Sequence, residues 1–132
     1  MDETENELLT LSQRFLDAIE QRDWEAYIEM CDPTLTAFEP EAVGNLITGL
    51  EFHRIYFDSS SRGMTVKSTI SSPDVRLMGD VAVITYVRLR QRVDAQGVHS
   101  TSAHEETRIW QKQDRAWKHV HFHRSKSGTV EL

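Results

Sequence analysis

The first third of the chain carries apolar residues at helical spacing. Five apolar residues are spaced so that all of them fall on one side of a helix, which is typical of a buried helix face. These residues are Leu8, Leu11, Phe15, Leu16 and Ile19. Thr4 and Glu7 stand just before them in the spacing of a capping box. The pattern therefore predicts an amphipathic helix over residues 5–21.

Two further helices are predicted before residue 63. Asp23 can cap a second, short helix, which must end before Pro33 because proline restricts the residue that precedes it. Thr48 and Glu51 form another capping-box pair, which predicts a third helix. The polar tract 59–63 is expected to end that helix.

After residue 63 the apolar period changes from about 3.6 to 2, which indicates strands. The expected strands cover residues 64–70, 75–78, 81–93, 98–112 and 116–124, and a short extended stretch precedes them at 35–38. Turn residues separate consecutive strands, so antiparallel hairpins are expected. Helices followed by a meander predict an α+β fold, with three helices packed on a strongly curved, mostly antiparallel sheet.

Length, composition and charge narrow the class of protein. With 132 residues, 39% of them apolar, the chain is expected to form one folded domain over 1–132, with residues 1–5 flexible. A net charge of −6 argues against nucleic-acid and anionic-membrane partners. An acidic start and the lack of a run of about 20 apolar residues indicate a cytoplasmic protein. Cys31 is the single cysteine and is expected to be a small buried helix residue.

Two predicted strands, 81–93 and 98–112, are much longer than the usual ~5–6 residues, so the sheet must bend and enclose a hollow. Residues 82, 84, 86 and 88 share one face of the first long strand. The other face carries Val87 and Leu89 and is also apolar. A small domain has too little chain to cover both faces, so we expect this second face to form a subunit interface.

The stretch HVHFHRSK at 119–126 raises the question of a metal site. His119, His121 and His123 would point to the same side at ~6.6–6.8 Å intervals, too far apart for one ion to hold all three. A zinc site would need further ligands, and the chain has no CxxC or HExxH motif. We therefore expect no metal, and we place the histidines with Trp117 on a half-solvated or interface face.

Three arginines continue otherwise apolar rows on successive strands. Arg88, Arg108 and Arg124 can converge in one cavity, where guanidinium groups would favour a carboxylate. Alternatively, each arginine can reach the rim and meet Glu105, Glu106 or an acid of the first helix. His53 on the third helix could complete a cavity site as a hydrogen-bond donor.

Four segments resemble the association, or hub, domain of calcium/calmodulin-dependent protein kinase II. The segments are ELLTLSQRFLDAIEQRDWEAY, CDPTLTAFEPEAVGNLITGLEFHRIYF, HEETRIW and HVHFHRS, and the likeness runs from about residue 6 to 125. The resemblance implies a cone-shaped fold of the nuclear-transport-factor-2-like (NTF2-like) superfamily. It also implies two stacked rings built from dimers, commonly dodecameric or tetradecameric, or larger.

The same resemblance implies a pocket at His53, Arg88, Arg108 and Arg124 that accepts small carboxylates and that has been linked to the kinase's regulatory segment. This chain has no glycine-rich phosphate loop and no HRD or DFG motif, so we expect no kinase activity. Mammalian members of that family carry a tryptophan in the loop after the third helix, where SSSRG stands here.

Two further expectations concern the pocket. An alternative function is a small isomerase- or hydratase-type enzyme that uses His53, although the sequence assigns no carboxylate partner to this histidine. No cofactor is expected. We also expect Arg108→Ala to remove carboxylate binding without loss of folding, because clustered arginines without a counter-ion would repel each other.

Overall fold

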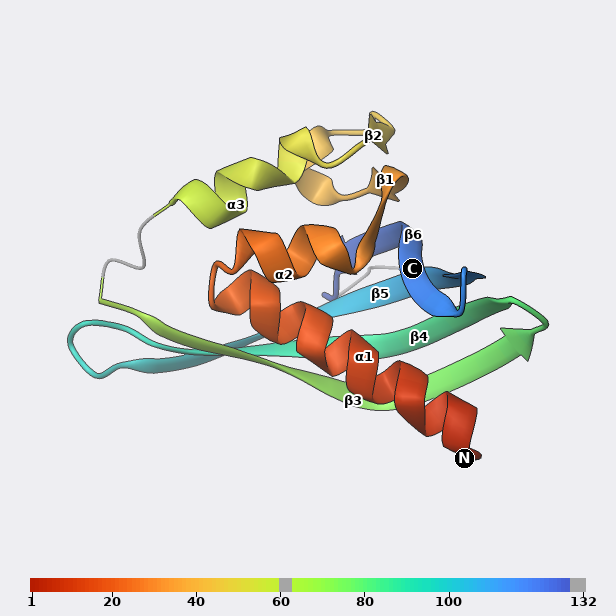
Figure 1. Cartoon of the computed structure of the whole chain (residues 1–132). Coiled ribbons are helices and arrows are strands. Elements are labelled where there is room, and N and C mark those ends of the chain that lie inside the picture. Colours follow the sequence, from red (N-terminus) through yellow and green to blue (C-terminus); the bar gives the residue numbers. More distant parts are fainter. Residues whose placement is uncertain (60–62, 129–132) are drawn as a thin grey trace, which may run out of the picture.

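The computed structural model describes residues 1–59 and 63–128, and a six-stranded sheet forms its frame (Figure 1). The strands are β1 (Cys31–Phe38), β2 (Ile47–Thr48), β3 (Thr65–Met78), β4 (Val81–Val93), β5 (His99–Gln113) and β6 (Ala116–Lys126). Their order in the sheet is β2-β1-β6-β5-β4-β3. All neighbours are antiparallel except β1 and β6, which are parallel. The predicted α+β class with a mostly antiparallel sheet is confirmed.

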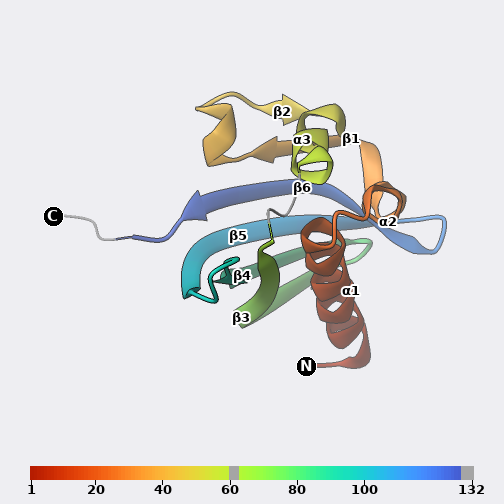
Figure 2. The ribbon, with the colours of Figure 1, turned by 90° about the vertical axis from the view of Figure 1, so that its left-hand side faces the viewer.

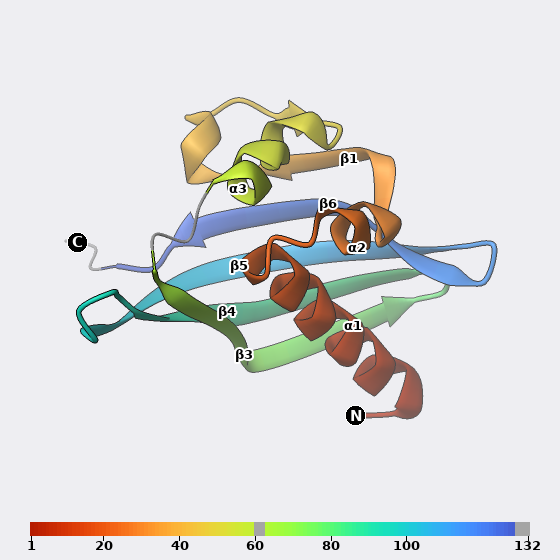
Figure 3. The ribbon, with the colours of Figure 1, turned by 60° about the vertical axis from the view of Figure 1, so that its left-hand side comes forward.

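The helices are α1 (Glu3–Glu20), α2 (Trp24–Glu29) and α3 (Arg54–Asp58), and short 3-10 helices cover Pro40–Ala42 and Glu51–His53. Figures 2 and 3 show α1, α2 and α3 on the same side of a strongly bent sheet. The predicted arrangement of three helices on one face is therefore present. The segment 1–5, expected to be flexible, is helical from Glu3 onwards.

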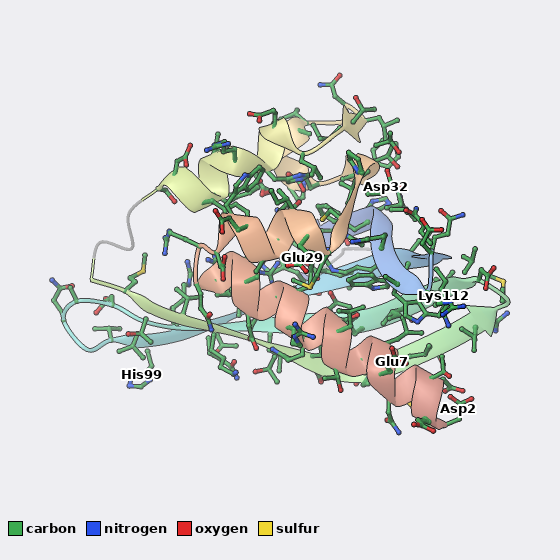
Figure 4. All side chains as sticks on the ribbon, in the orientation of Figure 1. Asp2, Glu7, Glu29, Asp32, His99 and Lys112 are labelled. Atoms are coloured by element: carbon green, nitrogen blue, oxygen red, sulfur yellow. The ribbon has the colours of Figure 1, made fainter. Side chains whose placement is uncertain are left out.

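The predicted helix caps are only partly correct. Asp23 caps α2 through a bond from the Ala26 amide. For α1, however, the cap is Asp2 and not Thr4, because the Asp2 carboxylate accepts a hydrogen bond from the Glu5 amide. Figure 4 labels Asp2 at the start of this helix. Thr48 caps no helix, since it lies in β2 opposite Thr36.

Two predicted strands, 64–70 and 75–78, are a single bent strand. β3 pairs with β4 along its length, with an irregularity between Ser71 and Asp74. Ser72 has a positive φ of 51°, and Pro73 follows it, so the alternation of side chains is interrupted there. The expected loop change at SSSRG falls largely on residues 60–62, which lie outside the described residues.

The core lies between the helices and the inner face of the sheet. Its buried aromatic members include Phe15, Tyr27, Trp110, Trp117 and Phe122, which pack with the aliphatic row Ala82 and Ile84 of β4. Cys31 is buried as expected, but it begins β1 and does not belong to a helix. Burial raises the pKa of the Cys31 thiol to about 12, so the group is protonated at neutral pH.

The outer face of the sheet carries a mostly apolar, half-buried row along β4. On β4 the even-numbered residues 82–88 are buried, whereas the odd-numbered residues 81–89 remain partly accessible. Ile109 of β5 continues this partly accessible surface opposite Val83. All the described helices cover the other face. Within the described residues, no helix is both long and apolar enough to cross a membrane.

Candidate functional site

A cavity of about 180 Å³ lies between the inner face of the sheet and the helices. Phe15, Ile19 and Glu20 of α1, Tyr27 of α2 and Tyr56 of α3 form part of its wall. The four residues expected in a pocket also line it: His53, Arg88, Arg108 and Arg124. The structure therefore brings these four side chains to one cavity, as the sequence analysis expected. Their role in binding a ligand stays a prediction.

Glu106 is the centre of the charge network in the cavity wall. Its Oε2 accepts from Arg88 Nη1 at 3.1 Å, and its Oε1 accepts from Arg108 Nη2 at 3.0 Å. The Tyr86 hydroxyl donates to Glu106 Oε1 at 2.5 Å and accepts from Arg108 Nε at 2.7 Å. These groups meet because β4 and β5 place Tyr86 directly opposite Glu106 on the inner face.

The charge of Glu106 is maintained by these neighbours. Burial alone would raise the pKa of its carboxyl, but the guanidinium groups of Arg108 and Arg88 and the Tyr86 hydroxyl outweigh that effect. The resulting pKa is about 2, so Glu106 is ionised at neutral pH. The Arg108 guanidinium also lies over the rings of Phe15 and Phe122, at 4.8 and 4.7 Å from their centroids.

A second acid, Glu20 of α1, connects the helix to the sheet. Arg90 donates to both of its oxygens, from Nε at 2.8 Å and from Nη2 at 3.2 Å. Ser68 of β3 donates to the same carboxylate at 2.8 Å and accepts from Arg88 Nε at 2.8 Å. Burial alone would raise the pKa of the Glu20 carboxyl. Arg90, Arg88 and Ser68 lower this pKa by a larger amount, so the net shift is downward.

Both alternatives for the arginines therefore hold in part. Arg88 and Arg108 are buried in one cavity, with 6% and 2% of their surfaces exposed. They nevertheless meet Glu106 and a first-helix acid, as the second alternative expected. The assumption that the arginines lack a counter-ion was wrong. Arg108→Ala would leave Glu106 buried with one arginine fewer, so we no longer expect this substitution to leave folding intact.

His53 has the carboxylate partner that the sequence analysis did not assign. It ends the 3-10 helix Glu51–His53, and its Nε2 lies 3.0 Å from Oε2 of Glu39. Both side chains are almost fully buried, at 4% and 1% exposure. Tyr56 donates to the other oxygen of Glu39 at 3.0 Å. The Nδ1 atom of His53 has no hydrogen-bond partner among the described residues.

Arg124 lies nearer the solvent than the other arginines of the set. Its Nη2 contacts both carboxylate oxygens of Glu41, and Tyr56 donates to Glu41 Oε2 at 2.8 Å. The exposed fractions of the Arg124 and Glu41 side chains are 16% and 36%. Burial raises the pKa of Glu41, but Arg124 and Tyr56 outweigh this and lower it overall. Both members of this ion pair line the cavity.

The expectation that His119, His121 and His123 share a face was wrong for His119. Consecutive residues Ile109 and Trp110 of β5 pair with His121 and His119, so Val120 is an extra residue in β6. This bulge turns His119 into the core, with no exposed surface. Its Nε2 lies 3.3 Å from Arg108 Nη1. Burial and the nearby Arg108 charge lower the pKa of His119 well below 6.5, which keeps the ring neutral.

Sequence reasoning missed four groups of the site. Glu39, Glu41 and Tyr86 are polar partners of His53, Arg124 and Arg108, respectively, and Tyr56 donates to both Glu39 and Glu41. The signal for Tyr86 was present, because it shares the inner row with Arg88. Glu39 and Glu41 follow a strand and flank Pro40, and no short-range pattern relates them to partners more than ten residues away. Throughout residues 1–59 and 63–128, no group of His, Cys, Asp or Glu is arranged to hold a metal ion.

Comparison with known families identifies the chain. The model of the calcium/calmodulin dependent protein kinase II association domain matches residues 4–128. The chain belongs to this family. A relative from Oryctolagus cuniculus, the delta subunit of calcium/calmodulin-dependent protein kinase type II, is 46% identical over 129 residues, which cover 96% of the chain. The match spans only 24% of that kinase's length.

Solved structures agree with this assignment and show the fold. The CaMKII hub homology domain of Chlamydamonas reinhardtii has a TM-score of 0.88 and 45% identity, covering 95% of this chain and 99% of that one. An NTF2-like superfamily protein from Salmonella enterica has a TM-score of 0.75 at 18% identity, covering 96% and 93%. The second likeness concerns the fold alone. The association domain described here therefore has the NTF2-like fold that the sequence resemblance implied.

Proposed function

We propose that this association domain is a non-catalytic hub that assembles copies of itself into a closed two-layer ring. The ring is built from dimers and contains twelve, fourteen or more subunits. Membership in the association-domain family supports this role. Closed rings form when a repeated contact between different surfaces turns each copy by a fraction of a circle.

The observation that carries the proposal is the outer face of the sheet. Val83, Val87 and Leu89 of β4 lie there half-buried, with Ile109 of β5 beside them, while the described helices pack on the opposite face. A sheet with two apolar faces needs a cover on both. A second copy of the same chain provides such a cover.

Size-exclusion chromatography with light scattering tests the assembly. We expect one large species whose mass does not depend on protein concentration over the micromolar range. A species with the mass of a single chain at every concentration would contradict the proposal.

The second part of the proposal is that the arginine-lined cavity binds a small carboxylate or an acidic peptide, including a kinase regulatory segment. Of the described residues that line it, five are arginines and three are glutamates. With Glu106 added from the wall behind them, the site keeps an excess of positive charge. Guanidinium groups also present paired donors that match a carboxylate.

A thermal-shift titration with butyrate tests this binding. A ligand at about 100 times its dissociation constant adds about 2.7 kcal/mol to stability, so the melting temperature should rise. Arg124→Gln should remove the rise, because it deletes the most accessible arginine of the set. Arg115→Gln, on the exposed turn between β5 and β6, is the matched control and should keep it. A rise that survives Arg124→Gln would place the ligand elsewhere.

The partners and location in this proposal follow from charge and family. We expect copies of the same chain and small anions as partners, and no nucleic acid or membrane, since the net charge is −6. The cytoplasm is the location that fits these partners.

A second candidate function rests on the His53 and Glu39 pair. A buried carboxylate that accepts from one ring nitrogen leaves the other nitrogen able to take a proton, as a general base requires. Such a base suits an isomerase or hydratase that removes a proton beside a carbonyl group. Exchange of the α-protons of acetoacetate in D₂O, faster than in buffer and abolished by His53→Ala, would favour this function. Exchange at the buffer rate would exclude this chemistry on that substrate.

A further inference from the structure

Among the acids of the cavity, Glu41 differs from the other three in how firmly it is held. The side chains of Glu20, Glu39 and Glu106 are between 0 and 5% exposed. Glu41 is 36% exposed, and its two described hydrogen-bond partners, Arg124 and Tyr56, line the cavity and are only partly buried. Its carboxylate can therefore leave and be solvated, whereas removal of a buried carboxylate would leave buried arginines unpaired.

The contact between Glu41 and Arg124 resembles the contact that a bound carboxylate ligand would make with this arginine. Arg124 Nη2 contacts both oxygens of the carboxylate, and a tyrosine hydroxyl completes the site at 2.8 Å. A small carboxylate that enters the cavity would accept hydrogen bonds from the same two donors, the Arg124 guanidinium and the Tyr56 hydroxyl. Arg88 and Arg108 are less available to it, because their guanidinium groups already bond to Glu106, Tyr86 and Ser68.

We propose that Glu41 acts as a tethered competitor, a built-in carboxylate that occupies the Arg124 subsite and must be displaced before an external carboxylate binds. The proposal rests on the proposed anion-binding function of this cavity and adds the residue that sets its affinity and selectivity. Anions that contact Arg124 with two oxygens displace Glu41, and anions with a single weak acceptor do not.

The position of Glu41 supports displacement without unfolding. It lies in the three-residue 3-10 helix Pro40–Ala42, which is followed by Val43 and Gly44 with positive φ angles of 50° and 85°. This short element belongs to no long helix or strand. Rotation of the Glu41 side chain toward solvent therefore changes no sheet pairing. A tethered carboxylate at an effective concentration of about 1 mM, with an intrinsic dissociation constant of about 0.1 mM for the subsite, weakens the binding of an external carboxylate about tenfold, so its removal should tighten that binding by about the same factor.

Three variants separate competition from charge. Glu41→Gln removes the charge, and Glu41→Asp keeps the charge but shortens the side chain so that it cannot reach Arg124 in the same way. Glu51→Gln removes one exposed negative charge from the neighbouring 3-10 helix and serves as control. Isothermal titration with butyrate gives the dissociation constant for each, and circular dichroism verifies that each variant is folded.

We expect both Glu41 variants to bind butyrate about tenfold more tightly than the wild type, and Glu51→Gln to bind as the wild type does. If the wild type binds butyrate and the Glu41 variants bind it equally or more weakly, the competitor role is wrong while the anion site stands. If Glu51→Gln tightens binding as much as Glu41→Gln, the effect is one of net charge, and the competitor role is again wrong. If neither wild type nor variants bind, the anion-binding function itself fails.

Discussion

At the scale of single residues, Glu106 lies between two arginines and a tyrosine in the cavity wall, and its side chain is fully buried. A buried carboxylate of this kind is tolerated because each oxygen accepts charged or hydroxyl donors. The same contacts place one negative charge between Arg88 and Arg108, and Arg88 also lies 3.6 Å from Glu20. Glu106 is therefore the acid that these two buried arginines share.

Glu106→Gln should destabilise the domain by about 3–5 kcal/mol, because it leaves two buried guanidinium groups without their shared counter-ion. The neighbouring Glu105 points to the outer face and is exposed, so Glu105→Gln is a matched control and should change stability little. Urea unfolding of both variants measures the difference. Equal stabilities would show that the network contributes nothing to folding.

The pKa of Glu106 also predicts an acid dependence of stability. The folded pKa of about 2 lies below the ordinary value of 4.5, so the stabilising effect is fully present above pH 4.5. It is lost as the pH falls from about 4.5 toward 2, by an amount of the order of 3 kcal/mol. The shifts of Glu20 and Glu41 have the same sign.

Denaturant unfolding at a series of pH values between 5 and 2.5 checks this dependence. The wild-type free energy of unfolding should fall steeply with acid, and the fall should be shallower in Glu106→Gln. Parallel curves for the two proteins would mean that Glu106 is not the group that titrates.

Predictions for single residues succeeded where the alternation of side chains along a strand alone decides on which face of the sheet a residue lies. Arg88 follows the apolar row of residues 82, 84 and 86, and Arg108 stands two positions before Trp110, so the inward direction of both could be inferred. Their pairing with Glu106 was one of two open alternatives, since alternation gives a face and not a distance. Glu39 and Glu41 could not be assigned, because their partners are distant in sequence: His53 lies 14 residues after Glu39, and Arg124 lies 83 residues after Glu41.

At the scale of elements, helix ends and strand irregularities decided which predictions held. The third helix was expected to begin at a capping box, but Thr48 pairs in β2 and the chain enters α3 through a 3-10 turn. The bulge at Val120 reversed the side on which His119 lies. Tertiary pairing sets both features, and neither leaves a reliable local signature.

The cap of α1 gives a direct test at this scale. Asp2→Ala should cost about 1 kcal/mol, because it removes the side chain that bonds the Glu5 amide. Thr4→Ala should cost much less, because Thr4 lies inside the helix. Thermal unfolding followed by circular dichroism compares the two, and a larger loss in Thr4→Ala would restore the capping box expected from sequence.

At the scale of the whole molecule, the fold could be predicted well from periodicity, and the family resemblance added the cone shape. The helices cover the cavity on the inner face, while the outer face keeps a half-buried apolar surface. The two faces therefore have different roles in the proposed hub. One face encloses the anion site, and the other joins subunits.

Val87→Glu should break the assembly into smaller species without unfolding the subunit, because it places a carboxylate in the half-buried apolar row of β4, opposite the existing charge of Glu105. Val98→Glu makes the same change at a position that is 60% exposed in the turn between β4 and β5, and it should leave the assembly intact. Sedimentation velocity reports both outcomes. An unchanged sedimentation coefficient in Val87→Glu would remove this face from the interface.

Native mass spectrometry of the wild-type chain tests the hub proposal most directly. The account predicts a ring with an even number of subunits, twelve, fourteen or more, that releases dimers when it is disrupted. A spectrum that shows only single chains at every concentration would contradict it.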